Sequence, residues 1–346
     1  MRSLKLSIAA TALLCGAPAT AHPIAYEQRL FTLEPDPTMP AVLEPYVDQN
    51  GEFDPGDFAW MRGRFEGDSE EEKARYKPIQ DWLDSCARGE SDRAVRELKA
   101  MGIPEVNPER IFVTTPFCAQ FWLQPRADAY EDFAEFEEHL ATTRPVFQAL
   151  AAAIELISHQ AEPHDSSLQQ ALLHVTIGEQ AARSSYSWLS NPTSGAPKLS
   201  KKQAPIFEAL LGNEIRKLDQ RNTAWLKSVV AEKGWPTVSL VGKESADNAW
   251  LLAQHADHDP VFQLKVLRTM EPLVAEKEVS PSNHAYLYDR IMLKLSGKQR
   301  HATQVACEDG KPVPLPLEEP EQMDEIRTEI GLGTFAEYTA RFSNLC

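Results

Sequence analysis

Long apolar runs are scarce in this sequence, and none reaches the roughly 20 residues that a membrane-spanning helix needs. The run from Val146 to Ile157 is interrupted by Gln148 and Glu155, so we expect it to form a buried helix. The other apolar run, Leu6 to Cys15, lies at the N-terminus and is also too short to span a bilayer. The sequence therefore predicts no membrane span in the mature chain.

Basic residues are in deficit as well. Lys and Arg number 35 against 51 Asp and Glu, which gives the chain a net charge of −16. Such an acidic protein repels phosphate-rich polymers and anionic membrane surfaces. We therefore expect no nucleic-acid partner.

Several common catalytic motifs are absent. The sequence contains no G-x-S-x-G elbow, no H-E-x-x-H helix, no phosphate-binding P-loop and no dinucleotide fingerprint. The usual hydrolase, protease and nucleotide-binding classes therefore lack their sequence signatures, and no cofactor is indicated.

The N-terminus has the layout of a secretory signal. Arg2 and Lys5 precede the apolar run, and the small residues Ala19-Thr20-Ala21 then form a cleavage site before His22. A lipoprotein signal is disfavoured because the residue before Cys15 is a leucine. Residues 1–21 are thus predicted to be a cleaved signal peptide, and the mature chain to be exported in soluble form to the periplasm or the medium.

Cysteines are few, and four remain after this cleavage: Cys86, Cys118, Cys307 and Cys346. Four cysteines in an exported chain suggest two disulfides, for which three pairings exist. Sequence order favours Cys86 with Cys118 and Cys307 with Cys346, and the alternative is four free thiols. No pair has the C-x-x-C spacing of a redox or zinc site.

Helical periodicity dominates the rest of the chain. The predicted fold is mainly α, an antiparallel helical bundle or an array of helical hairpins, with Pro-rich loops and at most a few short strands. The expected regions are a Pro-rich acidic lead-in (22–65), a helical N-terminal region (66–190), a Pro/Gly/Ser linker (191–200) and a helical C-terminal domain (201–346).

The N-terminal region should contain three helical stretches and one β-prone run. Helices are expected near 68–101, 127–158 and 166–189, and the β-prone run covers Ile111–Thr115. Pro145 should break the second stretch into two helices, because proline lacks the N–H of a helical hydrogen bond.

The C-terminal domain has clearer helix signals. An apolar stripe predicts a helix over 206–229 that ends by Gly234, and another helix is expected over 244–255. Asp259-Pro260 and Ser280-Pro281 each have the pattern of a helix start, for helices to about 276 and 295. The last three helices should pack antiparallel, and the tail should end in short helices.

Three polar clusters of this domain are candidates for chemistry. The first contains Gln254, His255 and Asp257, the second Asp289 and Arg290, and the third Gln299, His301 and Gln304. Histidine and carboxylates can bind a divalent metal or supply an acid and a base. Metal ligands usually come from separated segments, however, and Asp259 is already needed as a helix cap, so no metal site is assigned.

The order of motifs from Asn222 to Phe342 resembles an uncharacterised bacterial family, domain of unknown function 6624. The matching residues are Gly234-Trp235-Pro236, Val241-Gly242, Gln254-His255-Ala256-Asp257, Phe262-Gln263, Ala285-Tyr286-Leu287, Asp289-Arg290, Gln299, Thr303-Gln304, Gly310 and Gly331-Leu332. This chain departs from the family pattern at His301-Ala302, where Tyr-Gly usually stands. The resemblance implies no established activity.

Two functional hypotheses follow from these residues. In the first, the C-terminal domain forms a pocket for a small polar ligand, in which His255, Asp257 and Asp289 are candidate catalytic groups. The candidate ligand-binding groups of that pocket are Gln254, Arg290, Gln299, His301 and Gln304. In the second, the domain is a non-catalytic binding or scaffolding module of the cell envelope, and the same groups are caps and interhelical hydrogen bonds. We also expect His255 to lie beside Asp289, because the first and third of the packed helices should be neighbours.

Overall fold

The computed structural model describes residues 38–47, 57–111, 113, 116–121, 123–160, 167–190 and 197–340. In this part of the chain the fold is mainly α-helical with two short antiparallel strands, which confirms the predicted class. The predicted signal peptide (1–21), much of the lead-in and Cys346 lie outside the described residues, so these predictions stay as they are.

The N-terminal region begins with two 3-10 helices and contains two long α-helices, of 31 and 28 residues. Its elements are 3-10 helices at Ala41–Tyr46, Phe58–Met61, Pro108–Arg110 and Ala127–Ala129, and helices α1 (Glu70–Ala100), α2 (Pro116–Ala119), α3 (Phe133–Gln160), α4 (Leu168–Ser184) and α5 (Ser187–Ser190). Ser69 caps α1 by accepting a hydrogen bond from the backbone N–H of Glu72, whose side chain returns the bond.

The C-terminal helices begin and end close to the predicted residues. They are α6 (Ala204–Lys233), α7 (Val238–Val241), α8 (Lys243–Gln254), α9 (Pro260–Ala275), α10 (Pro281–Leu295), α11 (Met323–Glu329) and α12 (Phe335–Thr339), with strands β1 (Val305–Glu308) and β2 (Lys311–Pro314) and a 3-10 helix at Pro320–Gln322. Gly234 ends α6 with φ 77°, and Asp259 caps α9 by accepting from the N–H of Phe262 at 2.8 Å.

The predicted break at Pro145 is wrong. Helix α3 runs through Pro145 without interruption over 28 residues. The helix packs against α4 and α6 and buries Leu140, Leu150 and Ile154, and this tertiary packing compensates the backbone hydrogen bond that proline cannot make. Its length and composition would also allow Phe133–His159 to cross a membrane, although no membrane is part of the structure.

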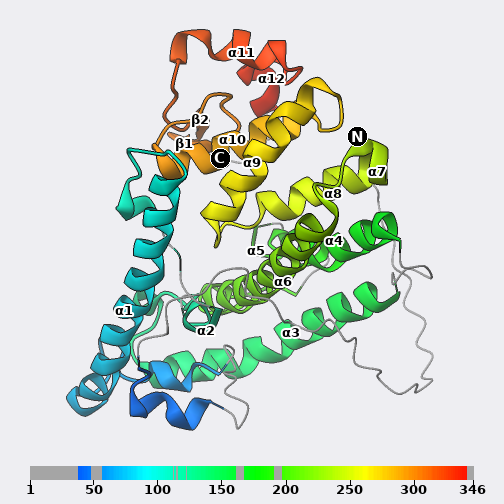
Figure 1. The fold of residues 1–346 in the computed structure, drawn as a ribbon. Coiled ribbons are helices and arrows are strands. Elements are labelled where there is room, and N and C mark those ends of the chain that lie inside the picture. Colours follow the sequence, from blue (N-terminus) through cyan, green and yellow to red (C-terminus); the bar gives the residue numbers. More distant parts are fainter. Residues whose placement is uncertain are drawn as a thin grey trace.

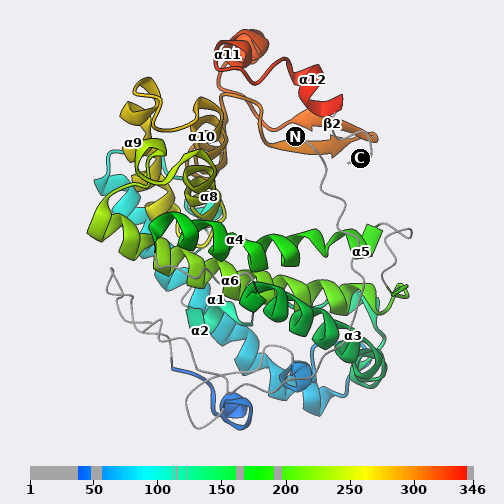
Figure 2. The same ribbon diagram turned by 90° about the vertical axis from the view of Figure 1, so that its right-hand side faces the viewer.

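The helices form a layered arrangement around shared cores. Helices α3, α4 and α6 lie side by side, α8 packs against α4 and α6, and α9 and α10 form a hairpin that packs on α8 (Figures 1 and 2). Helix α1 runs along one side and contacts α9. The β1–β2 hairpin with α11 and α12 lies at one end of the molecule in both views.

The hydrophobic cores do not follow the predicted linker. Each of the three core clusters combines residues from before 191 and after 200, as when Leu172 of α4 joins Leu226 and Leu252. The linker at 191–200 stays a prediction as a connecting segment, but the chain on its two sides packs together.

A disulfide holds α1 to α2 inside an aromatic core. Cys86 and Cys118 are bonded, with their Cα atoms 5.8 Å apart, which confirms this predicted pair. Both lie in a cluster with Trp82 and Phe121, whose ring centroids are 5.2 Å apart in an edge-to-face contact. The second predicted pair involves Cys346, outside the described residues, and stays a prediction.

Candidate functional site

Asp289 is a loop anchor. Its carboxylate is fully buried on α10 and accepts hydrogen bonds from the backbone N–H groups of Arg300, His301 and Thr303, each at 2.9 Å. Nδ1 of the His301 ring lies 3.1 Å from Oδ1 of Asp289. Burial raises the pKa of Asp289, but the hydrogen bonds from His301 and Thr303 outweigh it and hold the pKa below its ordinary value. The predicted groups Asp289 and His301 therefore fix the loop at 300–303.

The amides of this third cluster are structural too. Buried Gln299 donates to the carbonyls of Gln304 and Leu315 at 2.8 and 2.9 Å, and its oxygen accepts from the N–H of Gln304 at 3.0 Å. Fully buried Arg327 donates to the carbonyls of His301 and Ala302 from the other side. Nearly every polar group here has a partner within the protein.

Ala302 lies where the sequence was expected to depart from the family pattern. Its φ is 49°, in the left-handed region that favours glycine, and its side chain is fully buried. The backbone strain is held by the hydrogen bonds on either side of it.

The first predicted cluster lies elsewhere, at the turn between α8 and α9. The carboxylate of Asp257 accepts hydrogen bonds from Nε of Arg290 at 2.9 Å and from Nη2 of the same side chain at 2.5 Å. Nζ of Lys294 also contacts this carboxylate. Burial alone would raise the pKa of Asp257, but Arg290 and Lys294 lower it far below its ordinary value. The side chain of Asp257 is 45% exposed, so the turn between α8 and α9 is open to solvent at this residue.

His255 caps the end of α8 and faces α4 and α6. Its Nδ1 contacts Oε1 of Glu179, a fully buried residue of α4. Arg183, one turn further along α4, donates Nε to the same Glu179 oxygen at 2.9 Å and Nη2 to Asp219 of α6 at 2.5 Å. A histidine, two carboxylates and a guanidinium thus meet between three helices that the figures show side by side (Figures 1 and 2).

We call these groups the junction cluster: Glu179, Arg183, Asp219, His255, Asp257 and Arg290. Burial raises the pKa of Asp219 to about 7, against the opposing charge of Arg183, and the charges of Glu179 and Asp257 raise it further. For Glu179, burial also raises the pKa, but His255 and Arg183 outweigh it and lower the pKa. The carboxylates are therefore close enough to influence one another's ionisation.

Several buried polar atoms of this cluster, or of residues close to its members in the sequence, have no hydrogen-bond partner among the described residues. They are Oε2 of Glu179, Oε1 of Gln254, and both amide atoms of Asn222. Asn222 is only 2% exposed and stands one turn after Asp219 on the inward face of α6. Buried polar groups in proteins are nearly always paired, so these unpaired groups need an explanation.

The expected pairing of His255 with Asp289 is wrong. Helices α8 and α10 do pack together as predicted, but Arg290 faces the turn after α8 whereas Asp289 faces the 300–303 loop. Successive residues on a helix point about 100° apart, so only one of the two can face α8. The structure pairs Asp257 with Arg290 and His255 with Glu179, and it places Asp289, Gln299, His301 and Gln304 in a different polar group around the 300–303 loop.

Glu179, Arg183 and Asp219 were not among the predicted site residues. Glu179 and Arg183 were within the expected helix at 166–189, four residues apart, and Asp219 interrupts the apolar stripe beside Leu218. A carboxylate on the inward side of such a stripe is the signal that could have identified it, because burial requires a partner.

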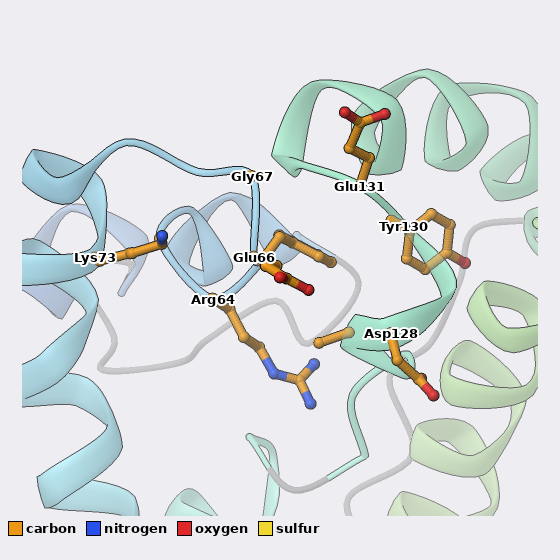
Figure 3. Close-up of a pocket in the computed structure, with 10 residues that line it drawn as sticks. Arg64, Glu66, Gly67, Lys73, Asp128, Tyr130 and Glu131 are labelled. Carbon is orange, nitrogen blue, oxygen red and sulfur yellow. The ribbon is translucent and has the colours of Figure 1, made fainter.

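A separate cleft of about 740 Å³ lies in the N-terminal region (Figure 3). It is lined by the loop at 63–67 and by Lys73, Ala127, Asp128, Tyr130 and Glu131, with Arg64 and Asp128 both drawn at its wall. Nη1 of Arg64 donates to the carbonyl of Pro125 at 2.6 Å, so this cation already holds two loops together.

One family model matches the chain. It describes a family of unknown function, DUF6624, and covers residues 166–344, just over half of the sequence. No curated protein and no solved structure matches. The matched region contains the junction cluster and the Asp289 loop, and it excludes the N-terminal cleft.

Proposed function

Since the chain belongs to the family of unknown function DUF6624, we propose its function from geometry: it is an exported protein that binds a small polar ligand at the junction cluster. The unpaired buried atoms of Glu179, Gln254 and Asn222 carry this proposal. The contrast with the Asp289 loop, whose carboxylate accepts several hydrogen bonds from the protein, supports it. A satisfied polar cluster stabilises a fold, whereas an unsatisfied one offers its groups to a ligand.

The charges of the cluster indicate the chemistry of the ligand. Carboxylates of Glu179, Asp219 and Asp257 alternate with the cations Arg183 and Arg290, and His255 lies between them. Such a mixed surface suits a compact molecule that both donates and accepts hydrogen bonds, as a zwitterion does. A polyanion such as nucleic acid would meet the acidic surface of the chain, so we do not propose it as a partner.

A pair of asparagines on α6 tests the proposal without knowledge of the ligand. Asn213 and Asn222 are both 2% exposed, but Asn213 donates to the carbonyl of Leu123 at 3.0 Å and Asn222 has no partner in the described chain. Asn213→Leu should lower the free energy of unfolding by about 1–3 kcal/mol. Asn222→Leu should raise it by about 1 kcal/mol, because it removes a buried group kept for a ligand.

Urea denaturation followed by circular dichroism measures both changes. Stabilisation by Asn222→Leu supports a ligand site, and an equal loss in the two variants favours a structural role. A thermal-shift panel of amino acids, sugars and inorganic phosphate then identifies the ligand class, since a ligand at 100 times its Kd stabilises by about 2.7 kcal/mol. Arg290→Met should abolish such a shift, and Arg268→Met, at an exposed position of α9, should not.

The alternative function is a scaffolding module. It is favoured by one observation: Arg183 ties α4 to α6, and Arg290 with Lys294 ties α10 to the turn after α8, as interhelical ion pairs do. If the cluster has only this role, Arg290→Met should reduce stability without affecting the binding of any compound in the panel.

A further inference from the structure

We propose that Glu179, Asp219 and His255 together bind one divalent metal ion of the zinc type. This inference rests on the proposed function, because it names an ion as the first occupant of the same site. The three side chains come from α4, from α6 and from the residue after α8. Ligands drawn from separated segments are the usual pattern of protein metal sites.

The spacing of the ligand atoms is close to what one ion requires. One oxygen of Glu179, one oxygen of Asp219 and one ring nitrogen of His255 all lie within 4.8 Å of one another. Zinc binds nitrogen and oxygen at about 2.0–2.2 Å, so ligands on one ion stand roughly 3.4 Å apart. Side-chain rotations that shorten these separations by about an ångström, from at most 4.8 Å toward roughly 3.4 Å, would bring the three atoms onto one ion.

Glu179 supplies the observation that points to an ion. Its side chain is fully buried, and its Oε1 is occupied by Arg183, by Gln180 at 3.0 Å and by His255. Its Oε2 has no partner in the part of the chain that the structure describes. A buried carboxylate oxygen without a donor is costly, and a cation compensates it.

Asn222 adds a second, independent observation. Its unpaired amide lies one turn from Asp219 on the same inward face. An amide there can hydrogen-bond a water molecule or a ligand held by the ion. Gln180 and Arg183 hydrogen-bond the first Glu179 oxygen and so fix the orientation of this carboxylate, as the outer groups of metal sites do.

The ligand set indicates the class of ion. Mg²⁺ and Ca²⁺ prefer oxygen alone, whereas a set of one imidazole and two carboxylates suits Zn²⁺ or a similar transition metal. Three protein ligands also leave a position open, as in catalytic zinc sites. The small polar ligand of the proposed function, or a water molecule, would occupy that position.

Isothermal titration of the chelator-treated chain tests this inference. We expect one Zn²⁺ per chain and binding of Mg²⁺ at least roughly tenfold weaker. His255→Gln and Asp219→Asn should weaken Zn²⁺ binding by about 100-fold or more. The matched control is His258→Gln, which removes a neighbouring histidine outside the proposed set and should bind as the wild type does. The visible absorption spectrum of bound Co²⁺ gives a second readout. This spectrum should be lost in His255→Gln and kept in His258→Gln.

Circular dichroism first establishes that each variant is folded. If Asp219→Asn does not fold, the wild type and the two histidine variants decide the question. A folded wild type that binds no stoichiometric Zn²⁺, or unchanged affinity in His255→Gln, overturns the metal site.

If Zn²⁺ fails to bind but Asn222→Leu still stabilises the chain, only the metal inference falls. If Zn²⁺ binds in one equivalent but Asn222→Leu destabilises the chain, the metal site stands and the polar-ligand proposal falls.

Discussion

Asp289→Asn should destabilise the protein strongly, because this carboxylate holds the 300–303 loop on α10. Oδ1 accepts from the N–H groups of Arg300 and His301, and Oδ2 from that of Thr303, all at 2.9 Å. An asparagine keeps a single acceptor oxygen, so its NH₂ group must face at least one of these backbone donors. A hydrogen bond to a charged group contributes about 1.5–3 kcal/mol, and an unpaired buried N–H costs about 1–3 kcal/mol. The expected loss in unfolding free energy is therefore about 3–5 kcal/mol.

Urea denaturation of wild type and variant at several pH values measures this loss and its origin. The pKa of Asp289 is lower in the folded protein than its ordinary value of 3.8. Its contribution is thus fully present above about pH 4 and disappears as the pH falls through the folded pKa. The difference between the two proteins should stay constant from about pH 7 to pH 5 and shrink only in stronger acid. Asp81→Asn, at an ion pair with Lys77 on the surface of α1, is the control and should cost less than about 1 kcal/mol. A loss at Asp289 no larger than that of the control would refute the anchoring argument.

Four further measurements address other parts of the chain. Replacing Cys86 and Cys118 by Ala should lower the unfolding free energy by about 4 kcal/mol, since their bond closes a loop of 32 residues; an unchanged denaturation midpoint contradicts this. Burial lowers the pKa of His258 to about 4, so as the pH falls the unfolded chain binds a proton at this residue before the folded chain does. The free energy of unfolding should therefore fall by about 3 kcal/mol from about pH 6.5 to pH 4, and His258→Gln should remove this fall. Ala302→Val should cost at least about 2 kcal/mol, because a β-branched residue resists the φ of 49°, whereas Ala302→Gly should fold normally. Intact mass of the exported protein should show that it begins at His22, and retention of residues 1–21 would disprove the cleavage.

Local signals explain which elements could be predicted. Asp259-Pro260 starts α9 and Gly234 ends α6, because capping and positive φ depend on the residue itself and its nearest neighbours. Pro145 shows the limit of the same reasoning. Its effect on α3 depended on packing against α4 and α6, which no local signal encodes.

The sequence alone indicated the helical class, most helix boundaries and the family, since these depend on periodicity, caps and motif order along the chain. It favoured the Cys86–Cys118 pair among three possible pairings, and the structure confirmed that pair. It also identified His255, Asp257 and Asp289 as polar groups worth attention. The partners of these groups depend on how the helices pack in three dimensions. A rotation of 100° between Asp289 and Arg290 on α10 sends one to a loop and the other to Asp257, and the packing of α4 and α6 brings Glu179 and Asp219 to His255 across 36 or more positions. The groups that face each carboxylate depend on these distant contacts, because a buried charge is satisfied by whatever the fold places beside it.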